Sequence, residues 1–161
     1  MVMDACSVIL LAKASVLEAV ADQHSVCVTK SVYDEVLQGK QKKYEDALLL
    51  ERLRDAQKIK IVTADEAFVC KLMNDFNMEE GEASTIAFGL ANKAIVATDN
   101  RQGRKAARVN GLQLVGSIEL IVHLVQLKRI NKAKGKAALE TLRKNGWFDN
   151  SLIERALEDV Q

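Results

Sequence analysis

Four acidic residues stand where the chain changes character, because each follows an apolar run or opens a helix-like stretch. Asp4 closes the run 1–3 and Asp99 closes the run 94–98. The other two are Glu35 and Glu82. In an open sheet of parallel strands, ligands bind where the strands end and the next elements begin. We therefore expect Asp4, Glu35, Glu82 and Asp99 to meet at one edge of a sheet and to form a divalent-cation site.

Carboxylates gathered in this way need a counter-charge. Two unit charges about 5 Å apart repel by roughly 3 kcal/mol at an effective dielectric near 20, so the group must hold protons or bind cations. Oxygen ligands without Cys or His select hard cations such as Mg²⁺ or Mn²⁺. Such an ion lowers the pKa of a bound water and stabilises charge on a phosphate. The pattern therefore favours a metal-dependent nuclease that needs no catalytic histidine.

Each acid has a simpler interpretation when it is taken alone. Asp4 fits a residue capping the turn at Ser7, and Glu35 fits a solvated helix acid. Glu82 fits a first-turn acid that complements the helix dipole. Asp99 fits the N-cap of a helix running to residue 110. Three neighbouring acids are interpreted as solvated: Asp34, Glu79 and Glu80. The order of the four acids along alternating strands and helices is what favours a shared site.

The bulk composition is that of one ordinary globular domain. The chain has 161 residues, of which 48% are hydrophobic and 28% charged, the usual proportions for such a domain. No apolar run approaches the length of a membrane span, and no signal-peptide pattern is present. The cysteines Cys6, Cys27 and Cys70 are scattered, which argues against disulfides or a zinc site and favours the cytoplasm. We expect a single domain over residues 1–161.

The net charge of +1 indicates little about partners, but the distribution of charge is uneven. Between Arg101 and Lys136, basic residues greatly outnumber the single acid, Glu119. A basic segment close to Asp99 suits a polyanionic substrate held near bound metal. The alternative is a set of solvated helix faces. Arg101, Arg104 and Lys105 are the candidates for contact with substrate phosphates.

Short apolar, β-branched runs alternate with helical patterns. The expected strands are residues 1–3, 26–28, 58–62, 94–98 and 112–115. Such alternation predicts an α/β fold with a mainly parallel sheet flanked by helices. After residue 116 the pattern is helical only. We therefore expect an α/β core over residues 1–116 and a helical C-terminal extension over residues 117–161.

Helical spacing of apolar residues predicts most of the helices. The expected ranges are 44–57, 63–76, 81–92, 100–110, 117–128, 132–144 and a terminal helix from 151. Two of them begin with capping-box patterns, in which a hydroxyl residue is followed three positions later by Glu. These patterns predict Thr63 and Ser151 as N-caps. Trp147 and Phe148 are expected to pack the tail rather than to stack on bases.

These segments resemble a PIN domain over nearly the whole chain. The run 2–13 looks like the first strand, first acid and following helix of that family, and 32–39 looks like the segment with its second acid. Gly81-Glu82-Ala83 resembles the start of the helix with the third acid, and 95–104 resembles the strand and turn with the fourth. The resemblance implies a three-layer α/β/α fold and a Mg²⁺- or Mn²⁺-dependent ribonuclease in which Asp4, Glu35, Glu82 and Asp99 hold the metal.

Three departures from the family pattern are visible. Cys6 stands where relatives often have a small hydroxyl residue, with Ser7 beside it, and Lys30 stands where a proline is frequent. Asn100 follows Asp99 where a second acid is common, so Asn100 is either a neutral ligand or no ligand. Cys6 has no placeable acid–base partner and is interpreted as a buried small apolar residue. Ser7, Thr98 and Asn100 are the expected polar neighbours of the acids.

The resemblance also implies partners. Many small PIN proteins are VapC-like toxins that cut RNA and are silenced by an antitoxin protein, and family members commonly form homodimers. The main alternative is a non-catalytic PIN-fold module that binds RNA or acts as an adaptor. A phosphoacceptor-Asp enzyme is disfavoured, because no suitably placed Lys and acidic pair accompany the candidate Asp. The sequence does not indicate an RNA target.

Overall fold

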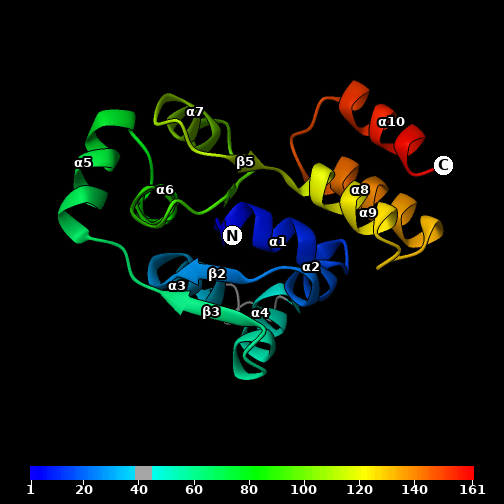
Figure 1. Cartoon of the computed structure of the whole chain (residues 1–161), viewed down its shortest axis with the longest axis horizontal. Coiled ribbons are helices and arrows are strands. Elements are labelled where there is room, and N and C mark those ends of the chain that lie inside the picture. The colour runs from blue at the N-terminus through cyan, green and yellow to red at the C-terminus, as the bar shows by residue number, and fades with distance from the viewer. Residues whose placement is uncertain (39–44) are drawn as a thin grey trace.

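Five parallel strands form the central sheet of the protein, whose computed structural model describes residues 1–38 and 45–161. The strands lie in the order β3-β2-β1-β4-β5 and are partly visible in Figure 1. Their bounds are β1 (Val2–Met3), β2 (Val26–Thr29), β3 (Ile59–Val62), β4 (Val96–Ala97) and β5 (Leu114–Val115). Each lies within or next to a run predicted as a strand. The parallel pairing confirms the predicted α/β class.

Helices connect the strands and continue beyond them. Before β4, the described residues form α1 (Ala5–Lys13), α2 (Leu17–Gln23), α3 (Lys30–Gln38), α4 (Glu45–Asp55), α5 (Glu66–Phe76) and α6 (Glu80–Asn92). After β4 they form α7 (Arg101–Val109), α8 (Ser117–Gln126), α9 (Lys132–Asn145) and α10 (Asn150–Asp159). Residue 44, with which the predicted helix 44–57 began, lies outside the described residues.

Two hydrophobic cores lie on the two faces of the sheet. Successive strand residues point to opposite faces, and in β1 Val2 belongs to one core while Met3 belongs to the other. The Val2 core contains residues of α5, α6 and α7. The Met3 core contains residues of α1 to α4 and of α8 to α10. This arrangement confirms the predicted three-layer α/β/α fold.

The C-terminal extension of residues 117–161 packs on the α/β core. Leu120, Leu139 and Ile153, one from each of its helices, are buried in the same core as α1. Figure 1 shows α8, α9 and α10 grouped at the end of the molecule opposite α5. Within the described residues, no helix combines the length and apolar character that a membrane crossing requires.

Two predicted N-caps are wrong. The helix expected to begin at Thr63 begins after Asp65, whose carboxylate accepts a hydrogen bond from the Phe68 N–H at 2.8 Å. The helix expected to begin at Ser151 begins after Asp149, whose carboxylate accepts from the Ser151 N–H at 2.9 Å. Ser/Thr and Asp are both strong cap residues. A capping-box pattern therefore does not distinguish between two cap residues that lie two positions apart.

The strand order places the first and fourth acids close together. β1 pairs with β2 on one side and with β4 on the other, so the order of strands reverses beside β1. In open α/β sheets the crevice for ligands lies outside the carboxyl ends of strands at such a switch point. Asp4 directly follows β1, and Thr98 and Asp99 directly follow β4. The fold therefore builds a crevice that these residues border.

Helices α8 and α9 of the extension pack closely against each other at Gly135 and Val125. Gly135 of α9 is buried, and a methyl group at its Cα would clash with the side chain of Val125 in α8. Overpacking costs about 1–3 kcal/mol, while alanine gains up to about 1 kcal/mol in a helix over glycine. Gly135→Ala should therefore lower the free energy of unfolding by about 1 kcal/mol in a urea titration. Val125→Ala in the same chain should relieve the clash, so the two changes should be markedly non-additive.

Candidate functional site

Asp4 lies at the centre of the crevice and is almost completely buried, with 2% exposure. One carboxylate oxygen caps α1 by accepting a hydrogen bond from the Ser7 N–H at 2.8 Å. The hydroxyl of Thr98 donates to its other oxygen. The simpler interpretation of Asp4 as a cap at Ser7 is thus correct, but capping does not use all the hydrogen-bonding positions of the carboxylate. Each carboxylate oxygen has a second lone-pair site for a further partner.

Burial makes the charge on Asp4 costly. Loss of solvation raises the pKa of its carboxyl to about 6, although hydrogen bonds from Thr98 and Ser7 lower it. The negative charge of Asp99 raises the pKa further. A buried carboxylate with raised pKa is a recurring feature of functional sites. Near neutral pH Asp4 is largely ionised, and a cation would stabilise that state.

Asp99 is held in place by two serines. It accepts a hydrogen bond from the Ser117 N–H at 2.9 Å and another from the Ser117 hydroxyl. The Ser7 hydroxyl donates to it at 3.1 Å. Ser7 therefore joins the two acids, since its N–H binds Asp4 and its hydroxyl binds Asp99. Burial raises the pKa of Asp99, and the Ser117 bonds partly oppose this.

Glu35 of α3 and Glu82 of α6 approach the crevice from neighbouring helices. Gly81 allows this approach, because a methyl group on its Cα would collide with a carboxylate oxygen of Glu35. One oxygen of Glu82 is buried without any hydrogen-bond partner. Loss of solvation raises the pKa of both carboxyls, and the charge of Asp4 raises both further. An unpaired buried carboxylate oxygen is costly, so a partner for it is expected.

One hollow of about 400 Å³ brings three of the four predicted acids together. Asp4, Glu35 and Glu82 line it, whereas the carboxylate of Asp99 is hydrogen-bonded to the two serines and lines a neighbouring groove. Glu79 also lines the hollow; it is exposed, as expected for a solvated acid, and its charge raises the pKa of Glu35 and Glu82. It directly precedes α6, and this proximity to Glu82 was the one sequence signal that pointed to it.

The donor set fits a hard divalent cation in its chemistry. The hollow offers carboxylate oxygens, one of which has no partner, and it has an amide side chain, Asn100, at its rim. Such ligands suit Mg²⁺ or Mn²⁺. Among the described residues, however, no three His, Cys, Asp or Glu side chains converge closely enough to hold one ion. A cation would therefore have to draw the flexible Glu35 and Glu82 side chains inward.

The predicted polar neighbours have distinct positions. Ser7 and Thr98 contact the acids directly, and the Thr98 hydroxyl also accepts a hydrogen bond from the Asn100 N–H at 3.1 Å. Asn100 caps α7, because its side-chain oxygen accepts from the N–H groups of Gln102 and Gly103 at 2.7 and 3.2 Å. The alternative in which Asp99 caps this helix is therefore wrong. Asn100 can act as the cap because its backbone is extended and it directly precedes the first turn of α7.

The three predicted phosphate ligands are not equivalent. Arg101 and Lys105 are exposed on α7. Arg104 is half-buried and donates to the Thr98 carbonyl oxygen at 3.0 Å, with Glu119 3.8 Å away. Arg104 thus braces the β4–α7 connection and the start of α8. Only Arg101 and Lys105 of this set are placed to meet a phosphate without breaking existing contacts.

Cys6 is exposed at the hollow, so its interpretation as a buried apolar residue is wrong. It occupies the first turn of α1 on the side facing the acids rather than the core. Loss of solvation raises the pKa of the Cys6 thiol to about 12, and the charges of Asp4 and Asp99 contribute. A thiol with so high a pKa stays protonated near neutral pH. It is therefore a poor nucleophile.

This thiol reports on the acids around it. In a Cys27→Ser/Cys70→Ser chain, Cys6 is the single thiol, and its raised pKa lowers the thiolate fraction near neutral pH. Alkylation by iodoacetamide near neutral pH should be at least about 100-fold slower than for a small model thiol. Adding Asp4→Asn should speed the reaction, because one of the repelling charges is removed. A rate close to that of the model thiol would contradict this description of the hollow.

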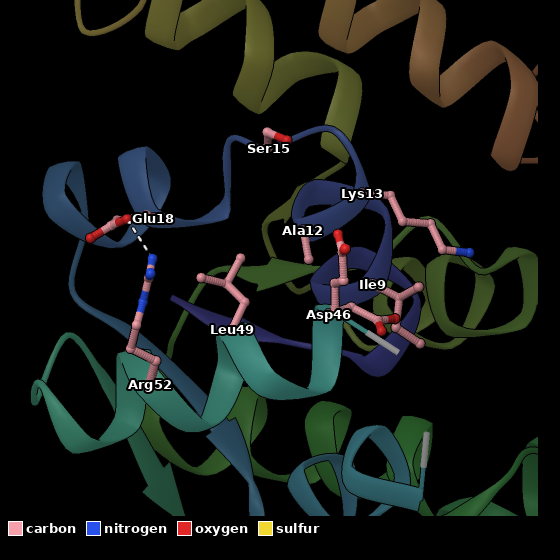
Figure 2. Close-up of a pocket in the computed structure, with 9 residues that line it drawn as sticks. Ile9, Ala12, Lys13, Ser15, Glu18, Asp46, Leu49 and Arg52 are labelled. Carbon is pink, nitrogen blue, oxygen red and sulfur yellow. Dashed lines mark hydrogen bonds and ion pairs between the residues drawn. The ribbon is translucent and has the colours of Figure 1, made fainter. Parts of the chain in front are cut away.

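A second hollow, of about 810 Å³, lies between α1 and α4. Figure 2 shows Ile9, Ala12 and Leu49 on its apolar side and the ion pair of Arg52 with Glu18 at 3.0 Å. None of the four predicted acids lines it. Two of its charged side chains, Arg52 and Glu18, neutralise each other in this ion pair. The acidic hollow therefore remains the candidate site.

Comparison with known proteins agrees with this architecture. A family model described as a PIN domain matches residues 1–161. Comparison with curated proteins and with solved structures gave no match. The family match covers all five strands and every acid of the hollow, and the three-layer fold is the one that the sequence resemblance implied. The chain therefore belongs to the PIN-domain family.

Proposed function

We propose that this protein is an endoribonuclease that hydrolyses RNA phosphodiester bonds with Mg²⁺ or Mn²⁺. The observation that carries the proposal is the buried, unpartnered oxygen of Glu82, which shares a hollow with Asp4 and Glu35. Burial raises the pKa of all three carboxyls, and the charges of neighbouring acids raise it further. Within the PIN-domain family, whose fold is of nuclease type, a divalent cation is the counter-charge that supports catalysis.

In the proposed mechanism, some residues bind the cation and others orient the residues that bind it. Asp4, Glu35 and Glu82 would hold the cation, which supplies an activated water and charge stabilisation at the phosphate. Asp99 completes the set, and Ser7 and Ser117 fix its orientation. Thr98 fixes Asp4 through its hydroxyl. Arg101 and Lys105 would attract and orient the phosphate backbone of the substrate.

The test is cleavage of mixed RNA and DNA substrates with Mn²⁺, run beside Asp99→Asn. Cleavage of RNA should require the metal, stop with EDTA and fall by orders of magnitude in Asp99→Asn. Glu80→Gln is the matched control, because Glu80 is exposed on the same helix as Glu82 and accepts from Ser31. Equal cleavage by parent and Asp99→Asn would mean that a contaminant or another site is responsible.

A non-catalytic RNA-binding or adaptor module is the second candidate. It is favoured by the lack, among the described residues, of three acids close enough to share one ion. Calorimetry with Mn²⁺ separates the two functions. An adaptor would give no heat that depends on the carboxylates, whereas the nuclease should give heat that Asp99→Asn reduces.

The toxin role, an antitoxin partner and a homodimer remain predictions from the family resemblance. A small DNA-binding protein encoded immediately upstream would favour the toxin role. Sedimentation of the purified chain would test the dimer directly.

A further inference from the structure

A groove of about 1050 Å³ lies beside the acidic hollow. Helix α7 forms one wall, α10 and the Trp147–Phe148 segment form the other, and Ile118 and Val122 of α8 contribute apolar surface between them. The groove adjoins the hollow at the start of α7. Asn100 and Gln102 line the hollow, while Asp99 and Arg101 line the groove. A chain leaving the hollow at this point would enter the groove.

The α7 wall is basic along its whole length. Arg101, Lys105 and Arg108 line the groove, are exposed and follow one another at spacings of four and three residues. Such spacing places them on one face of a helix, over about 10 Å of its axis. Helix α7 contains no acidic residue. A row of positive charge along one helix face is the pattern that binds a phosphate backbone.

The opposite wall carries an unusual aromatic residue. Trp147 is fully exposed, although the sequence predicted that it would pack the tail. Two more exposed large hydrophobic residues line the same groove, Val109 at 68% and Leu152 at 50% exposure. An exposed apolar cluster marks a binding surface more often than chance exposure. Indole rings stack on bases of any sequence, and a positively charged groove with stacking aromatics is how single strands are bound.

We propose that this groove binds a single-stranded stretch of the substrate, with phosphates along Arg101, Lys105 and Arg108 and a base stacked on Trp147. This inference rests on the proposed function, because it gives the substrate strand a path away from the acids. The charges on the second wall fix the orientation. Asp149 and Asp159 line it together with Arg155, so that wall is net negative and repels phosphates, whereas α7 attracts them. The backbone therefore follows α7 and the bases face Trp147.

Trp147 is the only tryptophan of the chain, so fluorescence excited selectively at tryptophan reports on this groove. The full-length protein is titrated in EDTA with a short oligouridylate, and in parallel with an RNA hairpin duplex. We expect saturable quenching by the single strand, weakened by salt, and little quenching by the duplex. Affinities of variants are measured with a fluorescein-labelled oligouridylate, because Trp147→Ala removes the intrinsic signal.

The variants separate stacking from charge. Trp147→Ala should weaken binding by about 10-fold, and Trp147→Phe should recover part of it. Arg108→Ala should weaken binding and reduce the slope of log affinity against log salt by about 0.7. Lys71→Ala is the matched control, because Lys71 is exposed on α5 at the opposite end of the molecule from α10 (Figure 1). It should leave both affinity and slope unchanged.

Two results would overturn the inference. The first is unchanged fluorescence at saturating oligouridylate, or equal affinity in Trp147→Ala, Arg108→Ala and Lys71→Ala. The second is salt-independent quenching that needs Leu152, because it would assign the groove to a protein segment or a second copy of the chain. Failure of the nuclease is distinguishable, since binding is measured without metal. Cleavage without quenching would contradict only the proposed role of the groove. Quenching without cleavage would contradict only the proposed nuclease activity.

Discussion

Replacing Asp4 with asparagine should abolish metal-dependent cleavage while making the metal-free protein more stable near neutral pH. Loss of activity is expected because the side chain at the centre of the hollow would no longer carry a charge for the cation. We expect a fall of at least about 100-fold in the rate of RNA cleavage. The stabilising half of the prediction follows from the pKa of Asp4.

Ionising Asp4 in the folded protein opposes folding. Its pKa is raised from 3.8 to about 6, so at neutral pH the charge costs about 3 kcal/mol relative to the unfolded chain. Asparagine removes that charge and keeps the geometry, because its amide oxygen can still accept from Ser7 N–H and its NH₂ can donate to the Thr98 hydroxyl oxygen. We therefore expect the thermal midpoint in EDTA near neutral pH to rise by roughly 6–12 °C.

Asp34→Asn is the control for this variant. Asp34 is exposed on α3 beside Glu35 and pairs with Lys30, and exposed pairs contribute little to stability. It should change neither cleavage nor the midpoint appreciably. A destabilised but fully active Asp4→Asn protein would contradict both halves of the prediction.

Stability of the metal-free protein should fall as the pH rises, and a cation should reverse the fall. Well below 3.8 the Asp4 carboxyl is protonated in both states and costs nothing. As the pH rises from 3.8 towards about 6, the unfolded chain releases the proton more readily than the folded protein does. The folded state therefore loses stability across that window. Glu35, Glu82 and Asp99 shift in the same direction.

The measurement is the thermal midpoint across this pH range in EDTA and in excess Mn²⁺. In EDTA the midpoint should decrease through the window, and in Asp4→Asn the decrease should be smaller. With Mn²⁺ at about 100 times its dissociation constant, binding to the folded state adds about 2.7 kcal/mol near neutral pH. The benefit should vanish at acid pH, where protons occupy the carboxylates. Equal midpoints with and without Mn²⁺ at neutral pH would be inconsistent with a cation site.

The sequence was sufficient for the strands because each is a short apolar run, and buried parallel strands have no competing pattern. Helix starts were harder to predict. Thr63 and Ser151 match a capping box, yet Asp65 and Asp149 cap the helices. The choice depends on where the preceding segment leaves the sheet or the tail. That is a property of tertiary packing and not of four consecutive residues.

The positions of the four acids were predictable from their order, but their side-chain directions were not. Asp99 turns towards Ser117, a contact across 18 residues, and no local pattern indicates that partner. Glu79 is exposed, as expected for a solvated acid, but its place at the hollow beside Glu35 and Glu82 was not predicted. Trp147 was expected to pack because large aromatics usually do. Its full exposure follows from the direction of the segment between α9 and α10.

Calorimetric titration of Mn²⁺ into the metal-free protein near neutral pH tests the central claim most directly. The carboxylates of the hollow should bind the ion with saturable heat, and Asp4→Asn should greatly reduce that heat while Glu80→Gln leaves it unchanged. No saturable heat, or the same heat in the parent and in Asp4→Asn, would contradict the claim that these acids hold a divalent cation.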